Sequence, residues 1–356
     1  MRREAVPARA VIVMLIVVCA AGFVATLALG TTPVPLADVV RALGGAGDAV
    51  FTVQELRLPR AVLGVLTGLA FGLSGAVFQS LLRNPLASPD VIGISAGAGT
   101  AAAFGIVVLG ASGGTVSLFA LGGACVTAAA IAWLAAGPGA ATARMILIGI
   151  GAAAILKSLL ALILSRASSW DLQGAMQWLA GSLNGATWEA IVPLALTCAV
   201  VIPALLLSAP TLGVLGLGDD LATGLGMRPA LTRWGLIALA VVLLAAATAA
   251  AGPISFVAFL AGPVAARLHG RGPAPLISAA LVGAALVLWA DLAGQLLFAH
   301  RYPVGVITGA LGAPVLIALL VRAGSPRSGS KSRPSSRDRS RSVRSSNPSE
   351  LRKQTS

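Results

Sequence analysis

Residues 61–82 read AVLGVLTGLAFGLSGAVFQSLL, a stretch without a single charged side chain. The hydrocarbon core of a bilayer is about 30 Å thick, and an α-helix needs about 20 apolar residues to cross it. The stretch therefore predicts a membrane-spanning helix. Gly64, Gly68, Gly72 and Ala76 recur at every fourth position. Small residues at this spacing let neighbouring helices approach closely and pack by van der Waals contact.

Comparable apolar runs recur along the chain. Hydrophobic residues make up 57% of the sequence and charged residues 10%, with a mean hydropathy of +0.92. Soluble domains carry about 25% charged residues. We therefore predict an all-α polytopic membrane protein with about ten spans. The expected spans are 10–30, 61–82, 91–109, 115–136, 144–165, 191–209, 231–251, 254–268, 275–298 and 304–322.

The distribution of basic residues predicts the orientation. Ten basic residues fall on the side of the N-terminus and five on the opposite side, as expected if the richer side is cytoplasmic. We therefore expect a multi-pass protein of the cell membrane with both termini in the cytoplasm. The first group is Arg2, Arg3, Arg9, Arg83, Arg144, Arg228, Arg233, Arg267, Arg271 and Arg322, and the second is Arg41, Arg57, Arg60, Arg166 and Arg301.

The C-terminal segment 323–356 differs in composition from the membrane-spanning body, residues 1–322. It is rich in Ser and Arg and has few apolar residues, so we predict a disordered cytoplasmic tail. A solvated end and an attraction to anionic lipid headgroups both remain open. The tail also carries much of the net charge of +13. The rest of the chain offers no basic groove with interleaved aromatics, which argues against binding nucleic acid.

Two charged residues lie within the expected spans, Lys157 and Asp291. A charge in hydrocarbon is costly, so each should face protein or water. Asp291 fits an interhelical hydrogen bond or a helix-end contact. For Lys157, snorkelling, internal pairing and a place in the translocation pathway that favours anionic cargo remain open. Gln79 and Asn84 are further candidates for the pathway.

No constellation of residues predicts an enzyme. Residues 151–158 resemble a phosphate-binding loop, but Leu156 replaces the required second glycine. His269 and His300 lack paired ligands, so we expect no metal and no cofactor. Because carboxylates are scarce within the spans, the energy for transport should come from a separate ATPase. An ion-coupled secondary transporter and a purely structural scaffold are the alternatives from other classes.

Four separated blocks of sequence resemble the signatures of the FecCD-type permeases, the vitamin B12 and iron–siderophore branch of the ATP-binding-cassette (ABC) importers. The blocks are RLPR at 57–60, GAVFQSLLRNPLASPDVIGI at 75–94, GPISFV at 252–257 and PVGVITGALGAP at 303–314. The resemblance extends over about residues 10–322. It is highly specific because the blocks occur in the order typical of the family.

The resemblance implies a ten-helix bundle like that of the vitamin B12 importer permease, translocating a ferric siderophore. It further implies a cytoplasmic ATPase dimer, a second permease subunit, identical or paralogous, and an extracytoplasmic siderophore-binding protein. Cobalamin and haem are alternative cargoes. Residues 261–263 read AGP where many relatives have Pro-His. This variant and the DLAGQ sequence at 291–295 look closest to ferric enterobactin permeases.

The resemblance also implies roles for individual residues. Arg57, Arg60 and Arg301 correspond to arginines that receive acidic residues of the binding protein, with ordinary interfacial anchoring as the alternative. Part of the loop 210–230 resembles the helices that couple the permease to its ATPase, with a plain connecting loop as the alternative. The coupling residues are Gly218, Asp219, Asp220, Leu221, Ala222, Gly224, Leu225 and Gly226. Of these, Asp219 or Asp220 should cap a short helix, whereas Gly224 and Gly226 should permit a sharp reversal.

Overall fold

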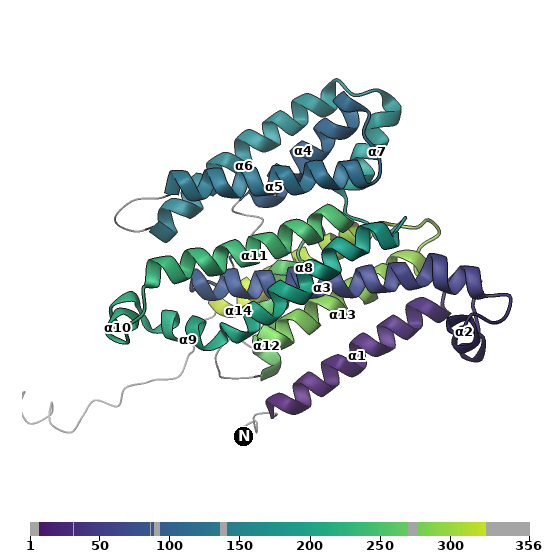
Figure 1. Ribbon diagram of the computed structural model, residues 1–356, viewed down its shortest axis with the longest axis horizontal. Helices are drawn as coiled ribbons and strands as arrows, with labels where there is room; N and C mark the ends of the chain where they lie inside the picture. Colours follow the sequence, from purple (N-terminus) through teal and green to yellow (C-terminus); the bar gives the residue numbers. More distant parts are fainter. Residues whose placement is uncertain are drawn as a thin grey trace, which may run out of the picture. The chain divides into compact units, whose positions relative to one another are not determined.

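Helices form all of the regular secondary structure in the described part of the chain (Figure 1). The computed structural model describes residues 7–30, 32–85, 87–88, 93–135, 141–269 and 276–324, with no side chains described for 141–143 and 318–324. The helices are α1 (Ala8–Ala28), α2 (Leu36–Leu43), the π-helix η1 (Phe51–Arg57), α3 (Leu58–Leu81), α4 (Ile94–Leu109), α5 (Gly114–Ala135), α6 (Ala141–Ser165), α7 (Ser169–Leu179), α8 (Trp188–Leu207), α9 (Ala209–Leu217), α10 (Asp219–Gly224), α11 (Pro229–Ala251), α12 (Val257–His269), α13 (Leu276–Leu296) and α14 (Val304–Gly324).

The helices agree with the expectation of about ten spans. Seven segments of the described chain are long and apolar enough to cross a membrane, and α4, α12 and α14 add three shorter apolar helices. The eighth expected span, 254–268, corresponds to α12, which begins three residues later, at Val257. Gly252 and Phe256 both have positive φ angles, and Pro253 lies between them. An α-helix cannot run through backbone of this conformation.

Helix α3 lies at the centre of the fold. It packs against α8, α11, α12 and α13, and most of its residues are buried. The small-residue repeat predicted for this helix marks its closest approaches. Within the repeat, Gly68 and Gly72 lie against the backbones of Ala284 and Ala279 on α13. Gly75, beside the repeat, lies against the backbone of Ala258 on α12. The predicted close packing of small residues is therefore confirmed for α3.

Helices α4, α5, α6 and α7 form a second group beside α11 and α8 (Figure 1). Here α4 packs on α5, α6 and α7. Gly97 of α4 lies against Gly123 and Thr127 of α5, so the pair crosses at glycine as α3 does with its neighbours. Residues 180–187 connect this group to α8.

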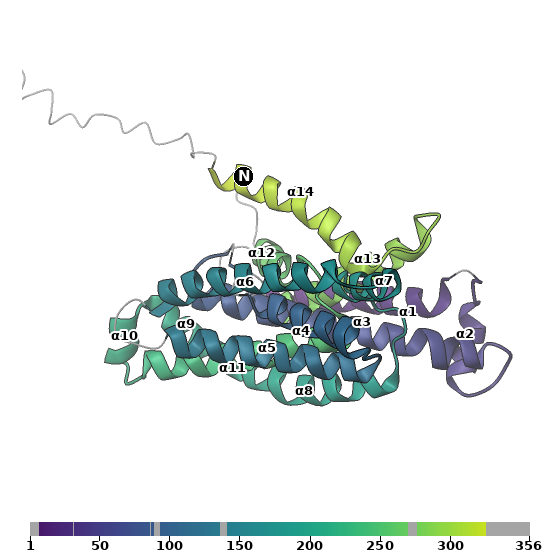
Figure 2. The same ribbon diagram turned by 90° about the horizontal axis from the view of Figure 1, so that it is seen from above.

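Helix α14 begins inside the bundle (Figure 2), and its residues become more exposed along Val304–Leu316. Val304 and Ile307 are buried, whereas Leu311 and Val315 are exposed. The compact unit that contains this first part of the helix extends over Met1–Leu316. The tail predicted at 323–356 lies, from residue 325 onwards, outside the described residues.

Short helices also lie between the spans. The amphipathic helix α2 follows α1, and α7 precedes the connection to α8. The segment predicted as the loop 210–230 contains most of α9 and the whole of α10. Helices α2 and α10 lie at opposite ends of the bundle (Figure 1). We refer to these as the α2 end and the α10 end.

Candidate functional site

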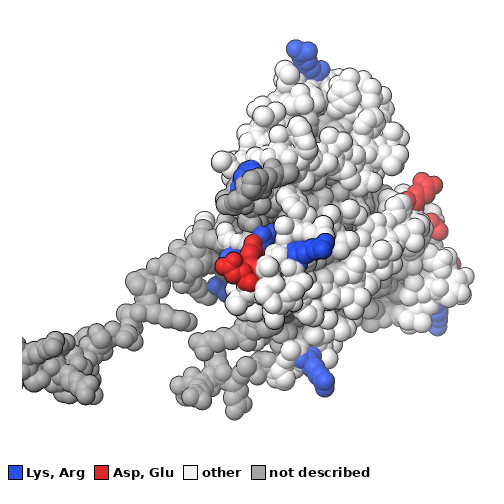
Figure 3. Space-filling view, turned by 60° about the vertical axis from the view of Figure 1, so that its left-hand side comes forward, with Lys and Arg blue, Asp and Glu red and all other residues white. Residues whose placement is uncertain are grey.

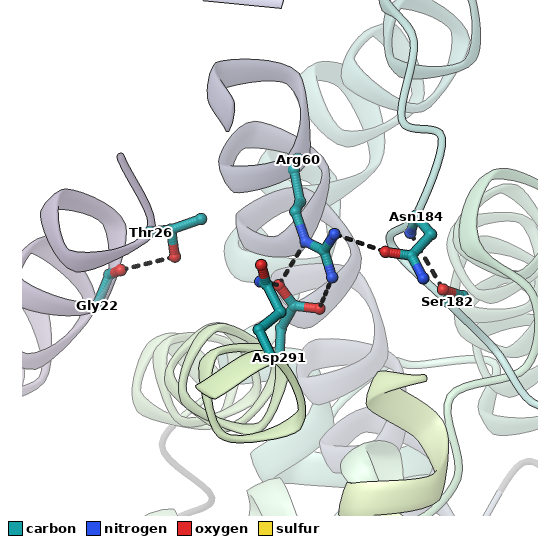
Figure 4. A network of polar contacts seen from close by, with 7 residues as sticks. Gly22, Thr26, Arg60, Ser182, Asn184 and Asp291 are labelled. Carbon is teal, nitrogen blue, oxygen red and sulfur yellow. Dashed lines mark hydrogen bonds and ion pairs between the residues drawn. The ribbon is translucent and has the colours of Figure 1, made fainter. Parts of the chain in front are cut away.

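Arg60 is held in a buried ion pair at the α2 end. Its Nε and Nη2 atoms donate to the two carboxylate oxygens of Asp291, each at 2.7 Å. Nη1 donates to Oδ1 of Asn184 at 2.6 Å (Figure 4). The side chains of Arg60 and Asp291 are 13% and 2% exposed. Gln295, one turn further along α13, donates a third hydrogen bond to Asp291. Asp291 thus makes the interhelical contact that was one of its expected roles.

Asn184 connects this ion pair to the 180–187 segment. Its backbone N–H donates to Oγ of Ser182, and the N–H of Ser182 donates to the carbonyl of Ala251 at the end of α11. The N–H of Gly305, at the start of α14, donates to the carbonyl of Gly181. Helices α3, α11, α13 and α14 are therefore joined through one short connection.

Arg57 closes the C-terminal end of α1. Its guanidinium donates to the carbonyls of Leu27 and Ala28 at 2.8 and 3.0 Å and also to the carbonyl of Thr32 at 2.5 Å. The last carbonyls of a helix have no partner within the helix, and a cation there also complements the helix dipole. Gly30 leaves room for this side chain, since a Cβ at that position would lie 2.8 Å from Nη2 of Arg57.

Arg301 is the exposed member of the three arginines predicted to receive a binding protein. It lies in the connection between α13 and α14, beside the edge-to-face pair of Phe298 and Tyr302. Arg57 and Arg60 contribute to the internal structure of the same end. Of the three arginines, Arg301 is therefore the most accessible to a protein partner.

At the opposite end, α9 and α10 form two short helices in succession. The residue that precedes α10 is Gly218, with φ 125°. Asp219 and Asp220 occupy the first turn without a side-chain capping bond, so the predicted capping by either residue is wrong. Their charges instead lie close to the positive end of the helix dipole. A positive φ suits glycine, which explains why Gly218 rather than aspartate precedes the helix.

The reversal after α10 depends on Gly226. Its N–H donates to the carbonyl of Thr223, and the N–H of Met227 donates to the carbonyl of Ala222. With φ 80° at Gly226, this pair of bonds is a Schellman motif. The prediction of a reversal is confirmed for Gly226, whereas Gly224 is the last residue of the helix itself.

Asp219 fixes α10 to the bundle. It accepts hydrogen bonds from Nη1 and Nη2 of Arg233 on α11 at 3.3 and 2.8 Å, and Nη2 of Arg83 lies 3.6 Å away. Arg83 also donates to the carbonyl of Leu215 on α9. The hydrogen bond from Arg233, opposed by partial desolvation and supported by the charges of Arg233 and Arg83, lowers the pKa of the Asp219 carboxyl below its ordinary value.

The residues predicted for the translocation pathway do not come together within the single chain. Gln79 is buried and donates from Nε2 to the carbonyl of Phe259 on α12 at 2.9 Å. Asn84 is exposed in the turn after α3, and Lys157 is exposed on α6. A common role for them would require a surface that a second subunit completes, and it stays a prediction.

The sequence profile of the FecCD transport family matches residues 15–322. The chain belongs to this family. The ferric enterobactin transport system permease protein FepG of Escherichia coli (strain K12) is 40% identical over 312 residues, which cover 87% of this chain and 94% of FepG. FepD, with the same transport system in its name and from the same organism, is 33% identical over 308 residues, covering 83% and 90%.

The all-helical fold is confirmed by a solved structure. A metal-chelate type ABC transporter in an inward-facing conformation superposes with a TM-score of 0.78, covering 88% of this chain and 99% of its own. Its sequence is 24% identical, so the likeness establishes the architecture alone. The expected family and the expected all-helical bundle are both confirmed.

A cavity of about 960 Å³ lies between α5, α7, α8 and α11 of this FecCD chain. Asn184 and Trp178 line it near the 180–187 segment, and Leu194 and Ala246 line it more deeply within the spans. None of the predicted pathway residues lies in its wall. It is therefore separate from the surfaces that carry Asn84 and Lys157.

Sequence reasoning did not identify the partners that position these FecCD residues. Asn184 precedes Gly185, a turn signal that marks a loop but not a contact with α3. Arg83 and Arg233 were recognised only as charges that indicate orientation. Their meeting at Asp219 depends on how α3, α10 and α11 pack, which no local pattern reports.

Proposed function

We propose that the chain is the permease subunit of an ABC importer that translocates a ferric siderophore across the cytoplasmic membrane. The observation that carries this proposal is the family match over residues 15–322, joined to 40% identity with a ferric enterobactin permease. The chain itself performs no chemistry. A separate ATPase supplies the energy.

ATP-driven uptake into proteoliposomes tests this function. The chain is reconstituted with a second permease subunit, an ATPase and a siderophore-binding protein. It should accumulate ferric enterobactin only when hydrolysable ATP is present on the side of the membrane that holds the ATPase. Cyanocobalamin and haemin serve as matched cargo controls and should not accumulate. Uptake driven by an ion gradient without ATP would contradict the proposal and favour a secondary transporter.

We propose that the α10 end is cytoplasmic and docks the ATPase dimer. Leu217, Leu221 and Leu225 are all large exposed apolar side chains of the α9–α10 segment. Asp220 adds an exposed charge beside them. A protein surface with apolar anchors and a charged rim suits a protein partner better than it suits water.

A substitution at the apolar anchor tests the docking of the ATPase. Leu221→Glu should reduce both co-purification of the ATPase and transport-coupled ATP hydrolysis. Leu231→Glu is the matched control, because Leu231 is similarly exposed but lies in α11, outside the segment. Equal losses in the two variants would show that the segment has no specific role.

We propose that the α2 end faces the extracytoplasmic binding protein and that Arg57, Arg60 and Arg301 contribute to its docking. Arg301→Glu should weaken binding through lost charge attraction. Arg60→Glu also breaks the ion pair with Asp291, so Asp291→Ala is its control. If Arg60 contacts the partner directly, only Arg60→Glu will weaken binding. Equal losses in both variants would assign Arg60 a structural role.

A further inference from the structure

Helix α2 leaves an apolar stripe uncovered. Leu36, Val40 and Leu43 are 58%, 69% and 44% exposed. Their spacing of four and three residues places them on one side of the helix. Phe51 and Leu56 of the adjoining η1 are also exposed. Such a group of large apolar side chains requires an apolar partner.

The other sides of α2 are already occupied. Val39 and Ala42 are buried in a cluster with Leu27, Val53 and Ala61, which fixes α2 against the ends of α1 and α3. Gln54 donates to the carbonyl of Ala42 and so holds the C-terminal end of the helix. These contacts fix the orientation of α2, so the helix cannot rotate to bury the stripe against the rest of the chain.

The charged pair of α2 lies opposite the stripe. Asp38 and Arg41 form an exposed ion pair at 3.4 Å. At 3.6 residues per turn, these positions fall on the side of the helix turned away from Leu36, Val40 and Leu43. The helix thus has a core-facing side, a charged side and an apolar side, and only the apolar side is without a suitable environment.

The position of α2 identifies what covers the stripe. Helix α1 is a membrane span whose exposed surface carries Val17, Val24 and, just beyond its last residue, Leu29. Only a short connection separates Ala28 from Leu36, and α2 lies beside this end of α1 (Figure 1). The stripe therefore lies next to the end of α1, at the depth where the span leaves the hydrocarbon. Figure 3, in which the α10 end comes forward, shows acidic and basic side chains gathered in a few places on a mostly uncharged face.

We propose that α2 is an interfacial helix whose stripe lies in the boundary between lipid headgroups and acyl chains. The bilayer is the partner of this surface, with the Asp38–Arg41 pair facing water. An amphipathic helix in this position buries its apolar side by a few ångströms and keeps its polar side hydrated. Because residues 44–50 and η1 connect α2 to Arg57, lipid contact also sets the height of the α2 end relative to the membrane.

Spin labels on α2 test the proposal in lipid nanodiscs. Single cysteines replace Leu36, Val40, Leu43, Asp38 or Arg41 in a full-length background in which Cys19, Cys125 and Cys198 are changed to alanine. Collision rates with oxygen, which partitions into lipid, and with a water-soluble nickel chelate are then compared. We expect oxygen collisions to dominate at the three stripe positions and nickel collisions to dominate at Asp38 and Arg41.

Two outcomes would overturn the interfacial helix. Dominant nickel collisions at Val40 would place the stripe in water. Loss of both kinds of collision at the stripe would mean that protein covers it, either a second copy of the chain or another subunit. Leu36 and Leu43 provide independent readings if the Val40 variant does not fold, and a monodisperse elution profile identifies the variants that are folded.

Discussion

At the scale of single residues, the two ends of the bundle use arginine in the same way. Arg60 satisfies a carboxylate on α13, and Arg233 satisfies one on α10. The difference lies in burial, because Asp291 is 2% exposed whereas Asp219 is 55% exposed. A buried carboxylate that loses its partner is left desolvated without a compensating charge, which strongly destabilises the fold. An exposed carboxylate remains largely hydrated, so the loss of its partner has a small effect.

Removal of the buried carboxylate of Asp291 should therefore lower the stability of the protein substantially. We expect Asp291→Ala to lower the free energy of unfolding by about 3 kcal/mol, because Arg60 is left buried without its counter-charge. Denaturation by SDS in mixed micelles measures the change. Asp38→Ala, which removes the exposed Asp38–Arg41 pair, is the control and should cost at most about 1 kcal/mol. If the effects of Asp291→Ala and Arg60→Ala simply add in the double variant, the pair is not coupled as the geometry implies.

The pKa of Asp219 makes the attachment of α10 dependent on pH. Because the folded-state pKa lies below the ordinary value of 3.8, the carboxylate contributes stability above that pH. The contribution is lost as the pH falls through the lower folded-state value. We therefore expect α10 to be equally well attached from about pH 5 to about pH 8.

An uncharged side chain at position 219 should remove the stabilising contribution of the carboxylate even at neutral pH. In Asp219→Asn, amide hydrogen exchange in α10 should accelerate by about five-fold, which corresponds to about 1 kcal/mol for a half-exposed pair. Asp220→Asn is the matched control, because no ion pair of Asp220 is present among the described residues. Faster exchange in both variants alike would point to the helix dipole rather than to Arg233 and Arg83.

At the scale of elements, close helix crossings organise the bundle. Glycines of α3 lie against the backbones of α12 and α13. In a membrane, lipid is as apolar as the side chains, so close packing replaces the hydrophobic effect as the force that joins helices. A side chain added at a crossing must separate two backbones, whereas one added on an open helix face displaces only lipid.

Substitutions of two glycines, one at a helix crossing and one on an open helix face, distinguish these two situations. We expect Gly75→Ala to destabilise the bundle by about 1–3 kcal/mol, because its new methyl group would overlap the carbonyl of Ala258. Gly122→Ala is the control, since nothing lies within 4 Å of the Cβ that it would add. The unfolding midpoint in detergent measures both. Similar midpoints for the two variants would show that the α3–α12 crossing can relax at little cost.

At the scale of the whole molecule, two helices present large apolar surfaces that the single chain does not cover. Ile155 and Leu159 of α6 and Leu311 and Val315 of α14 are all exposed. Lipid or a second permease subunit could cover each of these surfaces. FepG and FepD are separate permease proteins with the same named transport system, and both resemble this chain. We therefore propose that the second subunit is a paralogue.

Co-expression tests the choice of partner. With one affinity tag on this chain and another on a FecCD paralogue from the same organism, sequential purification should recover both chains in equal amounts. Two differently tagged copies of this chain provide the control and should not purify together. Efficient pairing of identical copies, with ATPase activity, would contradict the paralogous assembly and establish a homodimer.

The spans, the family and the reversal at Gly226 after the short helix α10 could all be predicted from the sequence, because each depends on a local run of residues. The length of apolar segments reflects the thickness of hydrocarbon, and the spacing of glycines reflects the helical repeat. Only tertiary structure could show that Arg60 meets Asp291, 231 residues away, or that Arg83 and Arg233 converge on Asp219. These contacts arise from the packing of separate helices, and so does the orientation of the stripe on α2.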